Sequence, residues 1–388
     1  MSFINQFAQS VQKYGPQAFS LNYRIADDPE LSGEEYHACA AYVEACRALG
    51  MEVTEQFAGL PTAFKATVRK VSNPVLKVAL LAEYDALPEI GHGCGHSANG
   101  AMSFLTAAAF LDMADLPVQV DLIGTPDEEL RGGKVAMCEQ GIFHDYDLAM
   151  MTHVMPDKTM ANSHFLALSD YRVAFHGQTA HAASSPWNGR NALNGAMLAI
   201  HAIDMLRQHV RPETRIGVYL VNGGTASNVV PDYAELECCV RHSDRPYLNE
   251  VIAKIMKCFE GAAIATETTY EVTQMGYEFD NMVWNEAATE VSRSVLREMG
   301  IPFTDTEECQ SSDIGNISHQ CPALHLCLAM GDTYYPEHSV QIADAVKNKA
   351  IEPVIAQGAE IMGRIVFKLL ENEGLRRAVQ EDFKKHTL

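Results

Sequence analysis

Apolar residues form short, nearly continuous runs along the first 160 residues, with stretches of helical spacing between them. The runs predict buried strands, and the intervening stretches predict amphipathic helices. The predicted strands cover 62–68, 75–82, 118–124 and 147–154, and the predicted helices cover 29–49, 98–113 and 130–141. Strands that alternate with helices at this spacing predict an α/β domain with a mostly parallel sheet and helices on both faces.

From about residue 165 the runs become longer and alternate between apolar and polar positions. They predict strands over 171–177, 215–224, 234–242 and 268–275, and helices over 189–208 and 246–261. This order of elements indicates a smaller α+β, ferredoxin-like domain. The α/β pattern then returns, with a helix over 284–299, a strand over 323–330 and a helical region over 339–372. We therefore predict one domain of residues 1–164 and 277–388, interrupted by an inserted domain of residues 165–276.

The first predicted helix carries a capping pattern. Ser32 stands at an N-cap position, Glu35 three residues later fits a capping box, and Gly50 follows the end of the helix. We therefore expect Ser32 and Glu35 to bond to the first turn of that helix.

The composition excludes several functions. The chain has 388 residues, enough for two domains, and its formal charge of −21 repels nucleic acid and anionic membranes. It shows neither a signal-peptide pattern nor an apolar run long enough to span a membrane, so we expect a soluble, cytoplasmic protein. Ten cysteines in so long a chain do not indicate a disulfide framework, and most are expected to be buried thiols.

One cysteine lies in a different setting. The segment from Glu83 to Gly100, EYDALPEIGHGCGHSANG, follows a predicted buried strand and places Cys94 and His96 in a glycine-rich loop. Glycines allow a loop to bend so that thiolate and imidazole ligands converge on a divalent ion such as zinc. Taken singly, these residues are also typical of a packed loop with a buried thiol.

Four more candidate side chains follow predicted strands: Glu128, Glu129, His153 and His338. In an adjacent acidic pair, one carboxylate can bind a metal while the other accepts a proton from water. Because ligands bind at the carboxyl ends of the strands in open α/β sheets, we expect these side chains to meet Asp85 and the cysteine loop at one edge. The sequence therefore predicts a metal site there.

Several motifs resemble those of a known family. The strings AEYDALPEIGHGCGH, GTPDEE, THVMP, GQTAHAA, SNVVPD, SSDIGNIS and PEHS occur in this order, and the match covers about residues 24–365. Together they resemble the di-metal amidohydrolase and peptidase family of aminoacylase-1, carboxypeptidase G and succinyl-diaminopimelate desuccinylase. The resemblance is strongest to its cysteine-containing branch, which includes hippurate hydrolase, p-aminobenzoyl-glutamate hydrolase, the indole-acetyl-amino-acid hydrolases and the aminoacylase-1-like dipeptidases. It implies a zinc-peptidase-like catalytic domain interrupted by a lid and dimerisation domain.

The resemblance also implies roles for individual residues. Five side chains would hold two divalent metal ions, with the thiolate bridging them: Cys94, His96, Glu129, His153 and His338. Glu128 would be the general base, and Asp85 would orient a ligand histidine. Zinc is the expected metal, with manganese and cobalt as alternatives.

In the inserted domain, the resemblance implies that His181 stabilises the oxyanion in the active site of a partner subunit. The protein would then be a homodimer or a higher homo-oligomer. Asn228 and Arg241 would hold the carboxylate of the substrate. Without the resemblance, Arg241 would be read as an ordinary exposed strand cation.

The chain departs from the cysteine-containing branch at four positions. Ser97 and Asn99 stand where an aspartate and a histidine are common, which is closer to the form of the aminoacylase-1-like and aminobenzoyl-glutamate enzymes. That subgroup usually has glycines after the paired glutamates, where this chain has Leu130 and Arg131. The metal ligands are intact, so these departures bear on the substrate, and the roles of Ser97, Asn99 and Arg131 stay open. We expect His92 to support the site rather than to bind metal.

The sequence therefore predicts a metal-dependent amidohydrolase acting on small N-acyl or N-aroyl amino acids or dipeptides. A hydroxide bridging two metals would attack the amide, with Glu128 as general base. The expected partners are a small anionic amide substrate and a second copy of the chain, but neither nucleic acid nor a membrane. Two alternatives stay open: hydrolytic deamination of an activated aromatic amine on the same site, and a non-catalytic small-molecule or metal-binding protein on this scaffold.

Overall fold

The computed structural model describes residues 3–305 and 310–387 and divides the chain into two compact units. Unit 1 comprises Met1–His164 and Met282–Leu388, and unit 2 comprises Phe165–Asn281. Nine cysteines lie in the described segments and all nine are free thiols. Of the helices within those segments, none is long and apolar enough to cross a lipid bilayer.

Unit 1 is built on a six-stranded sheet with the order β1-β2-β4-β3-β5-β10. The strands are β1 (Glu52–Glu55), β2 (Phe64–Thr67), β3 (Leu76–Ala82), β4 (Val118–Gly124), β5 (Leu148–Met155) and β10 (Ala323–Ala329). β4, β3, β5 and β10 are parallel, and β2 and β1 add an antiparallel edge. β3 and β5 are almost wholly buried, and their side chains are apolar except for Lys77, Thr152 and His153. The predicted mostly parallel sheet is confirmed.

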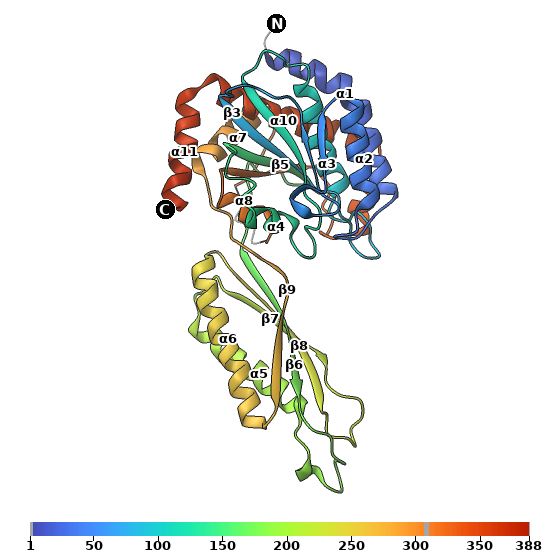
Figure 1. Ribbon diagram of the computed structural model, residues 1–388, viewed down its shortest axis with the longest axis vertical. Helices are drawn as coiled ribbons and strands as arrows, with labels where there is room; N and C mark the ends of the chain where they lie inside the picture. The colour runs from blue at the N-terminus through green and yellow to red at the C-terminus, as the bar shows by residue number, and fades with distance from the viewer. Residues whose placement is uncertain (1–2, 306–309, 388) are drawn as a thin grey trace. The chain divides into compact units, whose positions relative to one another are not determined.

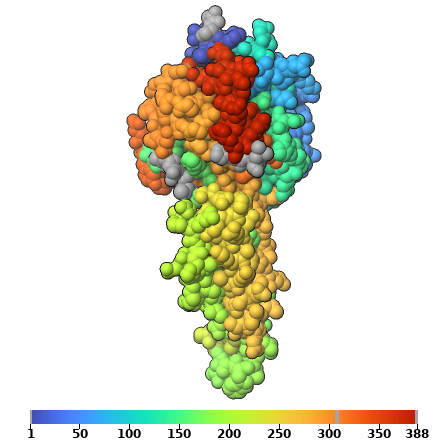
Figure 2. Space-filling model, turned by 90° about the vertical axis from the view of Figure 1, so that its left-hand side faces the viewer, coloured from blue at the N-terminus to red at the C-terminus, as the bar shows by residue number. Residues whose placement is uncertain are grey.

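The helices of unit 1 are α1 (Phe3–Asp27), α2 (Tyr36–Ala48), α3 (His96–Phe110), α4 (Gly133–Glu139), α7 (Glu286–Glu298), α8 (Ile314–Ser318), α9 (Val340–Ala345), α10 (Ile351–Glu371) and α11 (Glu373–Thr387). A short 3₁₀ turn covers Phe57–Gly59. α3 and α10 pack against the sheet, and α1 packs on both of them (Figure 1). In Figure 2, α11, in red, lies on the surface beside the orange α7.

Unit 2 is a four-stranded antiparallel sheet with the order β7-β8-β6-β9. Its strands are β6 (Ala167–His176), β7 (Arg215–Asn222), β8 (Tyr233–His242) and β9 (Thr269–Phe279), and its helices are α5 (Ala192–Leu206) and α6 (Arg245–Thr266). Alternate residues of β6 and β8 are buried beneath the two helices. The predicted order of strands and helices in the inserted domain is confirmed.

The predicted capping box is wrong. α2 begins at Tyr36, seven residues later than predicted, and the side chains of Ser32 and Glu35 do not bond to its first turn. The preceding residues form a turn instead: Leu31 makes a parallel bridge with Ala86, and the amide of Glu34 donates to the carbonyl oxygen of Leu31 at 2.9 Å. The amides of His37 and Ala38 bond instead to the carboxylate of Glu30.

Candidate metal and catalytic site

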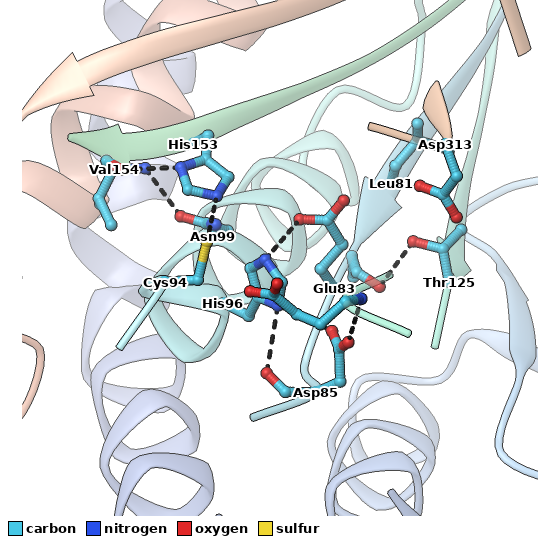
Figure 3. Close-up of polar contacts among 12 residues, drawn as sticks. Leu81, Glu83, Asp85, Cys94, His96, Asn99, Thr125, His153, Val154 and Asp313 are labelled. Atoms are coloured by element: carbon cyan, nitrogen blue, oxygen red, sulfur yellow. Dashed lines mark hydrogen bonds and ion pairs between the residues drawn. The ribbon is translucent and has the colours of Figure 1, made fainter. Parts of the chain in front are cut away.

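The carboxyl ends of three neighbouring parallel strands carry most of the predicted site residues. β3 leads to Asp85 and the loop before α3, and β4 leads to Glu128 and Glu129. His153 lies two residues before the end of β5, close to Cys94 and His96 (Figure 3). Among the described residues, four groups of possible ligands have donor atoms that all lie within 4.8 Å of one another: Cys94, His96 and His153; Cys94, Glu129 and His338; His96, Glu128 and Glu129; and Glu83, Glu128 and Asp313. The fold therefore brings all five predicted ligands and Glu128 together.

A glycine allows the cysteine loop to approach β5. Gly95 precedes the first residue of α3 and has a φ of +83°, a conformation that other residues rarely adopt. A Cβ at this position would lie 2.3 Å from Cγ2 of Val154. Glycine therefore permits both the turn and the close approach that bring Cys94 and His96 beside the end of β5.

His96 and His153 are oriented through their Nδ1 atoms. His96 Nδ1 lies 2.7 Å from Oδ1 of Asp85, and His153 Nδ1 lies 2.7 Å from the carbonyl oxygen of Val154 (Figure 3). Each Nδ1 therefore carries a proton and each Nε2 is directed toward the cluster. Burial by itself would lower the pKa of His96, but Asp85, Cys94 and Glu83 raise it well above its usual range, so a bound metal would replace the proton on its Nε2. His153 Nε2 lies 3.6 Å from Sγ of Cys94. This is the arrangement that imidazole ligands of metal ions require.

The carboxylate of Asp85 is held in place from three directions. In addition to the contact with His96, its Oδ2 accepts hydrogen bonds from the hydroxyl of Ser32 at 2.8 Å and from the backbone amide of Glu129 at 2.9 Å. Burial by itself would raise the pKa of Asp85, but the interaction with His96 and the donated hydrogen bonds lower it overall. Asp85 is therefore a charged carboxylate that links His96 to the loop of Glu129.

The electrostatics of the cluster suit divalent ions. Burial lowers the pKa of His153 to about 4, with a further contribution from His96, so the imidazole is neutral. Burial also raises the pKa of the Cys94 thiol, and a bound metal would counter this by deprotonating it. Within residues 3–305 and 310–387, Oε1 of Glu129 is buried without a hydrogen-bond partner. The donor atoms present therefore fit two divalent ions.

Glu128 and His338 differ in exposure. Burial raises the pKa of Glu128 well above its usual range, and the neighbouring carboxylates Glu83 and Glu129 raise it further. The His338 side chain is 54% exposed, and its Nε2 lies 3.6 Å from Oε2 of Glu129. The candidate ligands thus range from the buried His96, after β3, to the exposed His338, after β10.

Sequence reasoning missed a buried ion-pair network beside Glu128. Lys134 is fully buried, and its Nζ lies 2.7 Å from Oε1 of Glu83 and 2.5 Å from Oδ1 of Asp313. Glu83 Oε2 lies 3.4 Å from Nε2 of His96, so the network borders the metal cluster. Glu83 is the first residue of the glycine-rich segment and Asp313 lies in SSDIGNIS, so the sequence motifs could have pointed to both as site residues. Lys134 lies in none of the quoted motifs.

The residues whose roles were left open lie around the cluster. Asn99 Oδ1 accepts a hydrogen bond from the backbone amide of Val154 at 2.8 Å, which fixes the end of β5. Ser97 and His92 are buried. Arg131 is half-exposed, and its Nε pairs with Oδ2 of Asp127 at 2.7 Å.

In unit 2, His181 and Asn228 lie side by side. His181 bridges Val229, and the amide of Ala182 donates to the carbonyl oxygen of Asn228. Nδ1 of His181 accepts hydrogen bonds from the amides of Ala183 and Ser184, both at 3.2 Å. Its Nε2 therefore carries the proton, and the ring is exposed.

Arg241 lies at the other end of the same sheet. It pairs with Leu168, near the point where the chain enters unit 2, whereas the pairing of His181 with Val229 lies beyond Tyr233. At about 3.3 Å per residue, the stretch of β8 from Tyr233 to Arg241 covers about 25 Å. One copy of unit 2 therefore does not bring His181 and Arg241 together.

Comparison with known proteins agrees with these observations. Residues 167–267 match the model of a peptidase dimerisation domain. The chain is 30% identical over 397 residues to the Xaa-Arg dipeptidase of Mus musculus, covering 97% of this chain and 91% of the relative. It is 31% identical over 306 residues to a p-aminobenzoyl-glutamate hydrolase polypeptide of Escherichia coli, covering 74% of this chain and 63% of the relative.

The chain belongs to the M20 peptidase family. It is therefore a hydrolase of carbon–nitrogen bonds, and the predicted family is confirmed. A dinuclear metal-binding M20 peptidase from Bacillus subtilis has the same fold, with a TM-score of 0.72 and 17% identity over 93% of this chain and 99% of that one. An aminobenzoyl-glutamate utilization protein from Klebsiella pneumoniae gives a TM-score of 0.69 and 19% identity over 90% of this chain and 97% of that one.

Proposed function

We propose that this M20 protein hydrolyses the amide bond of small N-acyl or N-aroyl amino acids or dipeptides. The observation that carries the proposal is the convergence of two Nε2 atoms, a thiol and a carboxylate with an unpartnered oxygen beside Glu128. The names of the relatives agree, because they include a dipeptidase, a p-aminobenzoyl-glutamate hydrolase and a hippurate hydrolase.

Five residues would hold two divalent ions: Cys94, His96, Glu129, His153 and His338. Such ions activate water and polarise a carbonyl group when bound. Zinc, manganese and cobalt all suit this mixture of thiolate, imidazole and carboxylate.

Glu128 would accept the proton of the attacking water and return it to the leaving amine. A general base works best with a pKa near the working pH, and the surroundings of Glu128 raise its pKa in that direction. Asp85 would keep His96 oriented through the 2.7 Å contact with its Nδ1.

Unit 2 would act as a lid and dimerisation domain. The guanidinium of Arg241 and the amide of Asn228 are chemically suited to a substrate carboxylate. The protonated Nε2 of His181 is suited to donate a hydrogen bond to the oxyanion. Because His181 and Arg241 lie at opposite ends of the sheet, we assign them to the same active site from two different subunits.

Glu128→Gln tests this proposal. The amide keeps the size of the side chain but accepts no proton, so we expect turnover to fall at least about a thousandfold while two metals stay bound. Glu139→Gln, at the exposed end of α4, is the matched control and should keep full activity.

The assay uses N-acetyl amino acids, hippurate, p-aminobenzoyl-glutamate and dipeptides, with metal content measured in parallel. The proposal fails if metal-replete wild-type protein binds two ions but cleaves none of these amides. Ammonia release from an aromatic amine without amide cleavage would identify the site as a deaminase instead.

A further inference from the structure

Glu35 is a buried carboxylate outside the metal cluster. Its side chain is fully buried, and it accepts hydrogen bonds from three donors in three separate segments. Oε1 accepts from the amides of Gly33 at 2.7 Å and Asp127 at 2.8 Å, and Oε2 accepts from the hydroxyl of Thr62 at 2.9 Å. A carboxylate is costly to bury, so its partners indicate what it holds in place.

Of these partners, Asp127 has the least favourable backbone conformation. It directly precedes Glu128 and has a φ of +65°, which non-glycine residues rarely adopt. Its carbonyl oxygen accepts a hydrogen bond from the amide of Gly132 at 2.7 Å, so the turn closes on itself. Such a conformation persists only where surrounding contacts fix it, and the bond from the Asp127 amide to Glu35 is one of them.

The segments around Glu35 and Asp127 also interlock through side chains. The guanidinium of Arg131 lies against Gly33 so closely that a Cβ on Gly33 would be 1.7 Å from Nη2. Arg131 is in turn paired with Asp127. Residues 28–35 therefore brace the turn that carries the two glutamates at more than one point.

Glu35 is not needed to cap the helix that follows it. The first free amides of α2, those of His37 and Ala38, bond to Glu30 at 2.9 and 2.8 Å. The two oxygens of Glu35 are both directed away from that helix, toward the Asp127 turn and Thr62.

We propose that Glu35 is a positioning residue whose carboxylate fixes the Asp127 turn and thereby aims Glu128 and Glu129 into the metal cluster. It acts through the Asp127 amide and touches neither substrate nor metal. The inference rests on the proposed function for the roles of Glu128 and Glu129, but the contacts that carry it are independent of that function.

Two substitutions of Glu35 distinguish the effect of side-chain length from the effect of its charge. Glu35→Gln keeps the length of the side chain and an oxygen that can accept from both amides, but it removes the charge. Glu35→Asp keeps the charge but withdraws the acceptor by one methylene. Thr62→Val is the matched control, because it removes only the partner of the other oxygen.

Amide hydrogen exchange of residues 126–133 in the metal-free protein is the main readout, with exchange in α2 reporting whether the fold is intact. We expect Glu35→Asp to exchange about tenfold faster there, and Glu35→Gln and Thr62→Val to stay within about threefold of wild type. With metal and substrate present, Glu35→Asp should lower kcat about tenfold and change KM less.

Wild-type exchange in Glu35→Asp would overturn the proposal, and so would exchange in Glu35→Gln as fast as in Glu35→Asp. Activity is not needed for this decision. If the wild-type protein cleaves no amide, the exchange pattern still shows whether Glu35 holds the turn.

Discussion

At the scale of single residues, opposite charges share the interior beside the candidate site. Burial by itself would raise the pKa of Glu83, but Lys134 and then His96 lower it to about 2, so Glu83 is ionised. Burial raises the pKa of Asp313 to about 6 despite the same lysine. Lys134 is therefore the cation that pairs with Glu83 and Asp313. It does not pair with the neighbouring ligand carboxylate of Glu129, whose charge would be balanced by metal ions.

The grouping of the candidate ligands could be predicted because each lies near or beyond the carboxyl end of a strand, and parallel strands end at one edge. Lys134 could not be predicted in the same way. An isolated lysine in a sequence is ordinarily solvated, and its burial depends on Glu83 and Asp313 meeting it from distant parts of the chain. The spacing of Glu35 in the sequence fits a helix cap. Its carboxylate bonds instead to the backbone amide of Asp127, a tertiary contact that the sequence does not reveal.

Glu35 also makes stability depend on pH. Burial, followed by the charge of Asp85, raises its pKa to about 7 from an ordinary 4.5. Between these values the folded state holds a proton that the unfolded state has released, so this group lowers stability as pH rises and adds no further change above about 7. Its hydrogen-bond partners are the amides of Gly33 and Asp127 and the hydroxyl of Thr62.

We therefore expect Glu35→Gln to stabilise the metal-free protein at pH 8 by up to about 3 kcal/mol and to have little effect near pH 5. Thermal unfolding of both proteins at the two pH values measures this as a Tm difference of several degrees at pH 8 alone. An equal difference at both pH values would contradict the assigned charge state.

At the scale of elements, the strands were the easier part to predict. The run over 118–124 is β4 to the residue, because its apolar residues Val118, Val120, Leu122 and Ile123 are all buried and mark the strand. α1 was not predicted, because Gly15 and Pro16 interrupt it. Its buried residues nevertheless keep helical spacing: Phe7, Val11, Tyr14, Ala18, Leu21 and Ile25. Packing on α3 and α10 stabilises this helix despite its poor local propensity.

The crossing of α1 and α10 depends on Gly363. A Cβ there would lie 2.1 Å from the ring of Phe7, which is itself packed between Phe110 and Phe367 at centroid distances of 4.9 and 5.3 Å. Alanine normally stabilises a helix by about 1 kcal/mol relative to glycine, but overpacking costs about 1–3 kcal/mol. We expect Gly363→Ala to lower the free energy of unfolding by about 1–2 kcal/mol.

Gly261 provides the matched control. It lies inside α6, and nothing is within 4 Å of a Cβ added there. Gly261→Ala should therefore stabilise unit 2 by up to about 1 kcal/mol. Denaturant unfolding of both variants measures the contrast, and a shift of the same sign in both would show that helix propensity rather than packing decides.

At the scale of the whole molecule, the net charge of −21 and the proposed anionic substrate act against each other at long range. Under the proposed function, attraction would then be local, from the proposed metal ions and from Arg241. His181 and Asn228 lie more than about 25 Å from Arg241 along β8, so a site that uses all three needs two copies of unit 2. The match to a peptidase dimerisation domain over 167–267 agrees with such a requirement.

Mixing two inactive variants tests this arrangement. Glu128→Gln removes the base but leaves His181 for the partner, whereas His181→Ala keeps the base but provides nothing to the partner. In a heterodimer, the site with an intact Glu128 then receives an intact His181 from the other chain. Random pairing of equal amounts should restore about one quarter of wild-type activity, because half of the dimers are mixed and each has one complete site. If His181 acted within its own chain, the mixture would stay as inactive as either variant alone. Size-exclusion chromatography of the mixture would show in either case whether dimers had formed.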